Sequence, residues 1–465
     1  MRLSIKRLGP FSFYREVLHI ALPVMVQQLI MGMVSLIDNF MVAGLGDISM
    51  AAVNVANQLN FIALVIINAV CGAGGIYLAQ FNGAHDTEGM KNAYRFKVLF
   101  SCSVSVLYAG LCWTIPERML AMMTMGNGAQ EAIVSIGARY LRLSAVTFFP
   151  IALSIAIGTS FREIGLPKIP LVISVAATVV NTAGNWLLIY GNLGAPRFEV
   201  AGAALATIIA RFFEVGLFFL YIHTQPAQRK PFFAGFRTIF HSNAWLIREI
   251  LRKSAMMFLS EASWISSETI MTALYNGRGG AEVVAGMAAG WTMANIFFLL
   301  FGGIWITASV VIGGTLGAGK LEEAQIKAEW IKSGSVVAGC IVALVGATAT
   351  TLLIPLVFSN LTLAARSISL GLVYVILVYL PLWSLLNALF AISRAGGDTA
   401  TGMYADVSVN TLLFVPGAFI LALGTTLDPV LMFALLKISD LAKYGVARHF
   451  FKKNRWVRNL TKHPA

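Results

Sequence analysis

The stretch REVLHIALPVM, residues 15–25, occurs a second time in this chain in recognisable form. Its counterpart is REILRKSAMMF, residues 248–258, about 233 positions later, which also runs from charged residues into an apolar segment. Gly83 and Gly317 each follow an apolar segment and are separated by almost the same number of residues as the two motif copies. A pair of arginines further along the chain, Arg162 and Arg394, has a similar separation. The chain is therefore organised as two similar halves.

The composition places both halves in a membrane. Hydrophobic residues make up 58% of the 465 residues, charged residues only 12%, and the mean hydropathy is +0.77. Soluble domains carry about 25% charged residues. Between residues 16 and 447 the sequence holds about twelve apolar segments of about 20 residues, the length that crosses a bilayer as a helix. We predict an all-α integral membrane protein with twelve transmembrane helices.

The positive charges indicate the topology. The net charge is +13, and most of the 34 Lys and Arg residues fall on the segments that share a side with the N-terminus. In this assignment Lys437 and Lys443 count with the C-terminal tail. Because basic residues concentrate in cytosolic segments of membrane proteins, we expect both termini in the cytosol and the chain in the plasma (inner) membrane. The charge then reflects topology and contact with the lipid bilayer, and we expect no nucleic-acid partner.

The repeat predicts the domain organisation. Each half starts on the inner side and has an even number of spans, so the two halves have parallel topology, as in some secondary transporters. We assign residues 1–222 to an amino-terminal lobe of six helices and residues 248–447 to a carboxy-terminal lobe of six. A basic cytosolic linker covers residues 223–247, and a basic tail covers residues 448–465.

No motif for catalysis accompanies this architecture. The glycine-rich piece IGGTLGAGK, residues 312–320, is followed by Leu321 and so lacks the Lys-Ser/Thr ending of a phosphate-binding loop. The four cysteines lie in apolar stretches without metal-ligand or disulfide spacing. We therefore expect a protein that is not an enzyme, needs no cofactor, and draws its energy from an ion gradient.

Polar residues inside the spans are the candidates for function, because each one is costly in hydrocarbon. Asp38 shares a helical face with Gln27 and Ser35 in the first span. In the fifth span, Asn181 and Asn185 belong to a stripe that also holds a serine and a threonine. A desolvated carboxylate at position 38 could take up and release a proton. It could also hold Na⁺ together with the amide oxygens of the two asparagines.

A second group of polar residues suggests a site for substrate or for a second coupling ion. Glu261 and Glu268 are seven positions apart in the seventh span and so share a face. In the alignment of the two halves, Glu261 corresponds to Gln28 and Asp38 corresponds to Met271. This difference in residue type indicates that the two halves have different functions. The residues of this second group are Glu261, Gln28, Asn57, Glu268 and Asp406.

Three stretches resemble the multidrug and toxic compound extrusion (MATE) family. They are ALPVMVQQLIMGMVSLIDNFMVAGLG from Ala21, VNTAGNWLLIYGNLGAPRFEVAGAALAT at 180–207, and SRAGGDT at 393–399. The resemblance implies twelve transmembrane helices in two six-helix lobes around a central cavity. It also implies antiport, in which organic, often cationic and amphipathic compounds leave the cell in exchange for H⁺ or Na⁺.

The resemblance also implies roles for single residues. The acidic residue of the family's first helix matches Asp38, and the family's fifth-helix asparagine matches Asn181. Asn185 stands where the family has an aspartate, so one carboxylate of the usual pair is missing. Tyr140 and Thr207 match a fourth-helix tyrosine and a sixth-helix threonine of the same cation site.

In the carboxy-terminal half the resemblance is less complete. The seventh-helix glutamate of some members matches Glu261, whereas Trp383 stands where some members have a tenth-helix acidic residue.

Two alternatives remain open at the level of sequence. The same two-lobed architecture serves flippases and exporters of lipid-linked or other specialised compounds, and a strongly cationic cavity would favour that function. A receptor or membrane enzyme is the alternative from another class. For the exporter we expect small organic substrates and a monomer; the sequence selects neither the substrate nor H⁺ over Na⁺.

Overall fold

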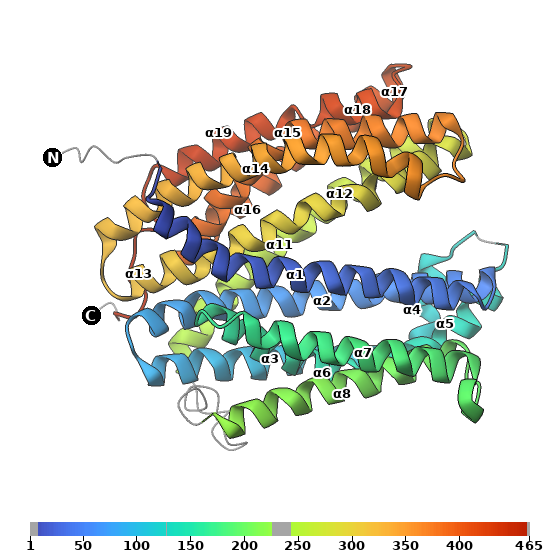
Figure 1. The fold of residues 1–465 in the computed structure, drawn as a ribbon, viewed down its shortest axis with the longest axis horizontal. Helices are drawn as coiled ribbons and strands as arrows, with labels where there is room; N and C mark the ends of the chain where they lie inside the picture. Colours follow the sequence, from blue (N-terminus) through green and yellow to red (C-terminus); the bar gives the residue numbers. More distant parts are fainter. Residues whose placement is uncertain (1–7, 127, 226–242, 463–465) are drawn as a thin grey trace. The chain divides into compact units, whose positions relative to one another are not determined.

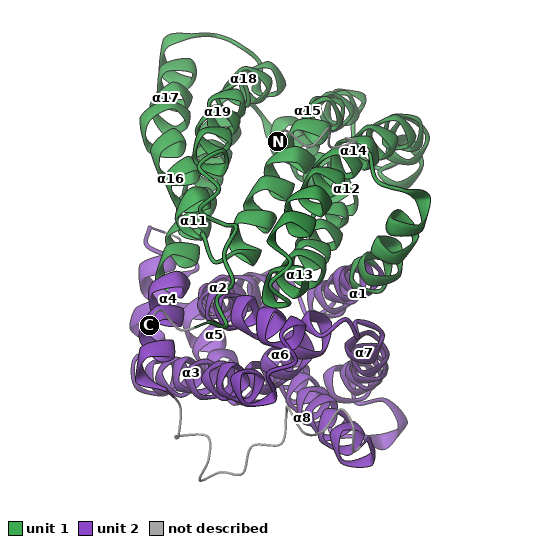
Figure 2. Cartoon of the chain, turned by 90° about the vertical axis from the view of Figure 1, so that its left-hand side faces the viewer, with its two compact units in different colours: residues 1–25, 255–465 green, residues 26–254 purple. Residues whose placement is uncertain are grey.

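The computed structural model describes residues 8–126, 128–225 and 243–462, and all regular structure in these ranges is helical (Figure 1). Most of the predicted linker, residues 226–242, lies outside the described residues, as do both chain ends. The described chain forms two compact units (Figure 2). Unit 2 consists of residues 26–254, and unit 1 of residues 1–25 and 255–465. The predicted lobe boundaries stay a prediction about the repeat.

Two long helices are shared between the units. Helix α1 (Phe11–Ala43) contributes its first part to unit 1 and the remainder to unit 2. Helix α11 (Ala244–Asn276) does the reverse, with its first residues in unit 2. These are the helices that carry the repeated motif: its first copy, residues 15–25, belongs to unit 1, and its second copy is divided, with residues 248–254 in unit 2 and 255–258 in unit 1.

Unit 2 is built from the remainder of α1, the first residues of α11 and seven further helices. Helices α5 and α6 bend by 48° at a short break and together make one apolar span. The bounds are α2 (Asp47–Gly83), α3 (Thr87–Thr114), α4 (Pro116–Met123), α5 (Gln130–Ala145), α6 (Phe148–Glu163), α7 (Lys168–Tyr190) and α8 (Val200–Thr224), with a short 3₁₀ turn η1 (Asn192–Gly194) between the last two.

Unit 1 holds the rest of the chain and contains two π-helical turns, η2 and η3. Both turns interrupt what would otherwise be continuous helices. The bounds are α12 (Ala281–Thr307), η2 (Ala308–Gly313), α13 (Gly314–Gly317), α14 (Leu321–Val357), α15 (Leu363–Ala395), α16 (Ala400–Val409), η3 (Asn410–Phe414), α17 (Val415–Gly424), α18 (Pro429–Leu436) and α19 (Ser439–Phe451).

The helices agree in place with the predicted spans. Among the described residues, nine helices are long and apolar enough to cross a membrane, or ten if α5 and α6 count as one span. Helix α11 is long enough but is not counted as apolar enough, because it contains several serines and charged residues. Helices α18 and α19 fall short because they have only 8 and 13 residues on either side of a break.

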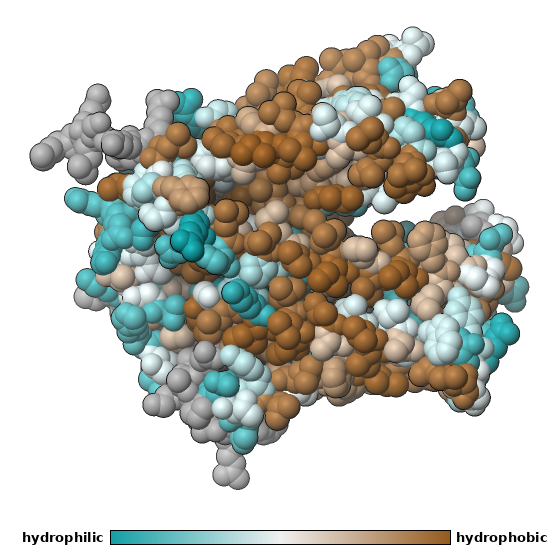
Figure 3. Space-filling model, in the orientation of Figure 1, coloured by the Kyte–Doolittle hydropathy of each residue, from teal (hydrophilic) through white to brown (hydrophobic). Residues whose placement is uncertain are grey.

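The outer surface suits lipid. In Figure 3 apolar side chains cover the middle of α1 and α7, and hydrophilic side chains gather toward the helix ends. The exposed apolar residues include Phe40 on α1 and Val179 on α7, which are 76% and 63% exposed. Large apolar residues face outward here because the surrounding hydrocarbon is as apolar as a protein core.

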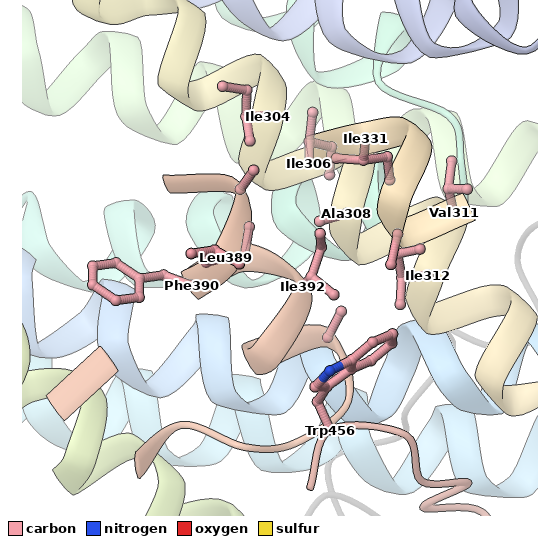
Figure 4. Packing of buried hydrophobic residues seen from close by; sticks show 14 of the residues in the cluster. Ile304, Ile306, Ala308, Val311, Ile312, Ile331, Leu389, Phe390, Ile392 and Trp456 are labelled. Atoms are coloured by element: carbon pink, nitrogen blue, oxygen red, sulfur yellow. The ribbon is translucent and has the colours of Figure 1, made fainter. Parts of the chain in front are cut away.

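The interior of unit 1 is a packed aliphatic cluster. Side chains from α12, η2, α14 and α15 meet there, with Trp456 of the C-terminal segment against them (Figure 4). Small residues allow the helices to approach closely. A Cβ on Gly286 would lie 2.6 Å from the carbonyl oxygen of Ala365, and Ser369 Oγ donates to the Gly286 carbonyl at 2.7 Å. Such contacts are typical of helix packing in membranes.

Unit 2 contains a buried ion pair away from its cavity. Lys97 Nζ on α3 donates to Glu163 Oε2 on α6 at 2.7 Å and to Ser160 Oγ at 2.9 Å, and Lys97 is fully buried. Gly75 on α2 makes room for this pair, because a Cβ there would lie 1.8 Å from Glu163 Oε1. The pair ties α3 to α6 and leaves no charge uncompensated at that point.

Candidate functional site

Unit 2 encloses a cavity of about 400 Å³, which we name the Asp38 cavity. Helices α1, α2, α5, α7 and α8 form its walls. All five residues predicted for cation coupling line it: Asp38, Asn181, Asn185, Tyr140 and Thr207. The structure therefore brings together residues that are up to 169 positions apart in the sequence.

The carboxylate of Asp38 is held by the residue that replaces the family's aspartate. Asn185 Nδ2 donates to Asp38 Oδ1 at 2.6 Å, and Asn185 is only 1% exposed. The side-chain oxygen of Asn185 is buried and has no hydrogen-bond partner in the described chain. A carboxylate and an unpaired amide oxygen thus lie next to each other, which are the oxygen ligands that suit a hard cation.

The other predicted residues form hydrogen bonds around this pair. Asn181 Nδ2 donates to Thr207 Oγ1 at 3.3 Å, which joins α7 to α8. Tyr140 Oη donates to Asn57 Oδ1 at 3.4 Å. Asn57, which we had grouped with Glu261, lines the Asp38 cavity instead.

Gln28 does not line the Asp38 cavity. It is exposed on α1 and belongs to unit 2, whereas Glu261 belongs to unit 1.

Arg211 lines the Asp38 cavity but is paired elsewhere. Its Nη1 donates to Glu214 Oε2 at 2.9 Å. Ser174 Oγ donates to the other oxygen of Glu214 at 3.0 Å, and Gln27 Nε2 donates to Ser174 Oγ at 2.8 Å. Two members of the predicted polar stripes, Gln27 and Ser174, therefore serve to anchor the Arg211–Glu214 pair.

Unit 1 encloses a second cavity of about 340 Å³, which we name the Lys437 cavity. Three predicted residues, Glu261, Glu268 and Asp406, line it. The walls also carry eight aromatic side chains: Trp264, Trp291, Phe298, Phe301, Trp305, Trp383, Phe390 and Phe414.

The Lys437 cavity also contains charged residues that the sequence analysis placed elsewhere. Lys437 and Lys443, assigned to the cytosolic tail, line the cavity and are 5% and 7% exposed. Neither lysine extends into the C-terminal segment, because each has a carboxylate partner inside unit 1. A fourth carboxylate, Asp440, was missed altogether. The spacing of Lys437, Asp440 and Lys443 at every third position within the predicted last span is the signal that could have revealed them.

Every carboxylate of the Lys437 cavity has a basic partner. Glu268 accepts from Lys437, and Lys443 Nζ lies 3.2 Å from Asp406 and 3.6 Å from Asp440. Glu261 lies 3.5 Å from Arg394 and has the most exposed side chain of the four, at 43%. Its partner Arg394 stacks over the Trp305 ring at 4.3 Å.

Trp383 forms a hydrogen bond with an acidic residue of another helix. Its Nε1 donates to Asp440 Oδ2 at 2.7 Å. A carboxylate from α19 therefore lies beside the position where some MATE proteins have an acidic residue on the tenth helix. Asp406 is held in addition by Ser260 Oγ.

Among the residues that the structure describes, no group of three or more His, Cys, Asp or Glu side chains is arranged to hold a metal ion.

Comparison with known proteins gives a consistent family match. The MatE family profile matches residues 23–187 and 257–420, one segment in each half. A probable multidrug resistance protein NorM from Neisseria meningitidis is 24% identical over 352 residues, covering 74% of this chain and 73% of that protein.

Solved structures share the fold. A MOP superfamily transporter from Pyrococcus furiosus superposes with a TM-score of 0.82 at 18% identity, covering 97% of both chains. A MATE protein in its bent conformation also gives 0.82 at 18% identity, with 95% of both chains covered. The MATE fold has twelve helices in two lobes, so the predicted fold class is confirmed.

Proposed function

This chain belongs to the MATE family of membrane transporters, and we propose that it exports organic compounds, cationic or amphipathic, in exchange for H⁺ or Na⁺. The proposal takes alternating access as the mechanism, with the plasma (inner) membrane as the location, both termini in the cytosol and a monomer as the working unit. The multidrug resistance name of the Neisseria relative supports the class of substrate.

One observation carries the assignment of the coupling site. Asp38 forms no ion pair with a basic side chain among the described residues, whereas all four carboxylates of the Lys437 cavity have a Lys or Arg within 4 Å. A carboxylate in a membrane needs a partner. At Asp38 that partner is the coupling cation, and in its absence Asn185 supplies the single neutral hydrogen bond that holds the group.

The remaining residues of the Asp38 cavity would orient the ion. For Na⁺, the ligands would be the Asp38 carboxylate and the side-chain oxygens of Asn181 and Asn185. For H⁺, protonation of Asp38 would remove the charge that Asn185 stabilises. Tyr140 and Thr207 would fix Asn57 and Asn181 through their hydrogen bonds.

Glu261 is the group that we propose for a cationic substrate or a second ion. Its contact with Arg394 is long and its side chain is the most exposed among the acidic groups of its cavity, so an incoming cation could reach it. The flippase alternative needs a strongly cationic cavity. The Lys437 cavity carries four acidic and three basic side chains, so it does not favour that alternative.

The decisive experiment is transport by the purified protein in liposomes. Ethidium movement would be followed by fluorescence under an imposed pH gradient or an imposed Na⁺ gradient, one at a time. We expect one of the two gradients to drive ethidium against its concentration difference. Equal ethidium movement in protein-containing and protein-free liposomes under both gradients would overturn the proposal of cation antiport for this substrate class.

A further inference from the structure

The ammonium group of Lys437 lies in a cage of aromatic rings. Its Nζ is 4.8 Å from the ring centre of Phe414, 5.1 Å from that of Phe433 and 5.6 Å from that of Trp383. Glu268 accepts a hydrogen bond from the same ammonium, and the lysine side chain is 7% exposed. Three rings and a carboxylate around a desolvated cation are the arrangement by which proteins recognise organic ammonium ligands.

Four separate elements build this cage. Trp383 comes from α15, Phe414 ends the π-helical turn η3, Phe433 lies in α18, and Glu268 projects from α11. Lys437 is the C-cap residue that follows Leu436, the end of α18, so its side chain enters the cage from the break before α19. A surface lysine would need none of these contacts, because water solvates it.

Only one of the two Glu268 carboxylate oxygens has a hydrogen-bond partner in the described chain. Glu268 Oε2 is buried and has no hydrogen-bond partner in the described chain. Lys437 therefore satisfies one oxygen of Glu268 and leaves the other unpaired.

Lys443 provides an internal comparison. It also contacts buried carboxylates, those of Asp406 and Asp440. No cation–π contact joins Lys443 to a ring among residues 8–126, 128–225 and 243–462. The cage is thus specific to Lys437.

We propose that the three rings and Glu268 form a binding site for organic ammonium ions, which the chain's own Lys437 occupies as a tethered ligand. An ammonium compound enters the cage only by displacing the lysine side chain. Lys437 thereby lowers the affinity of the cavity for organic cations and keeps its charge balanced when no cation is bound. This inference refines the substrate class of the proposed function and rests on it for its role in transport, but binding itself can be measured without transport.

The test removes the tether and supplies its ligand in solution. Lys437→Ala deletes the atoms of an n-propylammonium ion. Binding of radiolabelled tetramethylammonium and n-propylammonium to the purified full-length protein would be measured at constant ionic strength, with NaCl as the balancing salt. We expect both ions to bind Lys437→Ala at least tenfold more tightly than the unmodified protein.

Lys443→Ala is the matched control. It uncovers carboxylates without a cage, so we expect it to gain affinity for n-propylammonium, which can donate hydrogen bonds, but not for tetramethylammonium, which cannot. Equal tetramethylammonium affinity in the unmodified protein, Lys437→Ala and Lys443→Ala would overturn the proposal.

A double variant covers the case in which Lys437→Ala does not fold. Lys437→Ala with Glu268→Gln removes both charges together, vacates the cage and keeps the three rings. We expect it to bind tetramethylammonium more tightly than the unmodified protein, and no gain would count against the cage. Because no gradient is used, failed ethidium transport together with a positive binding result would refute the antiport proposal alone.

Discussion

The Asp38 cavity and the Lys437 cavity compensate buried carboxylates in opposite ways. In the Asp38 cavity one carboxylate is held by a neutral amide, and the arginine in the wall is already paired with Glu214. In the Lys437 cavity four carboxylates share three basic side chains of the same unit. A site that must exchange ions with solution keeps its carboxylate without a resident cation, and a site that supplies its own cations keeps each carboxylate paired when it is empty.

The largest effect is expected from Asp38→Asn. The variant keeps the size and hydrogen-bonding capacity of the side chain but cannot exchange a cation, so gradient-driven ethidium export should fall to the level of protein-free liposomes. Glu322→Gln changes an exposed carboxylate of α14 outside both cavities, so it is the control and should retain gradient-driven export. If Asp38→Asn exports at the unmodified rate, the contrast between the cavities has no role in coupling.

A large loss of stability is expected from Lys443→Met. The change leaves Asp406 and Asp440 side by side without their shared ammonium, and removing one partner of a buried ion pair costs about 3–5 kcal/mol. Thermal unfolding in detergent should show a lower midpoint than for the unmodified protein, and Lys443→Arg should recover part of it. An unchanged midpoint would mean that these carboxylates are not charged in the folded protein.

A qualitative change is expected from Asn185→Asp. The variant restores the second acidic residue of the family's cation site, next to Asp38, and two adjacent carboxylates hold an additional cation more readily than one. The number of coupling ions exchanged per substrate, measured from the substrate gradient that balances a known ion gradient, should rise. An identical ratio in both proteins would show that position 185 does not set the stoichiometry.

The smallest effect is expected from Tyr140→Phe. It removes one hydrogen bond of 3.4 Å to Asn57, and a single neutral hydrogen bond contributes about 1 kcal/mol. The ion concentration that gives half-maximal export should therefore rise by about fivefold or less. A loss as large as that of Asp38→Asn would instead place Tyr140 among the groups that bind the ion directly.

The part of the site that follows helical periodicity could be predicted from the sequence. Asp38, Asn181 and Asn185 lie on polar stripes of uninterrupted helices, and periodicity alone places their side chains on one face of each helix. Lys437 and Lys443 could not be placed in this way. They lie at and after the break between α18 and α19, where the helical phase restarts, and charged residues near the end of a chain resemble a solvated tail.

Repeat symmetry was a weaker guide. It relates Glu261, which lines the Lys437 cavity, to Gln28, an exposed residue of α1, and Asp38 to Met271, a buried apolar residue of α11. Each half has accumulated its own charges on a common scaffold, so equivalent positions share backbone geometry without sharing chemistry.

The π-helical turn η3 has a consequence for how the Lys437 cavity is shaped. A π turn takes one more residue than an α-helical turn, and such turns are frequent at functional sites. The residues after the turn therefore do not keep the helical phase that an uninterrupted α-helix from α16 into α17 would give them. Phe414, the last residue of the turn, lines the Lys437 cavity. The backbone irregularity, and not the residue type alone, thus decides which side chains of this segment reach the cavity.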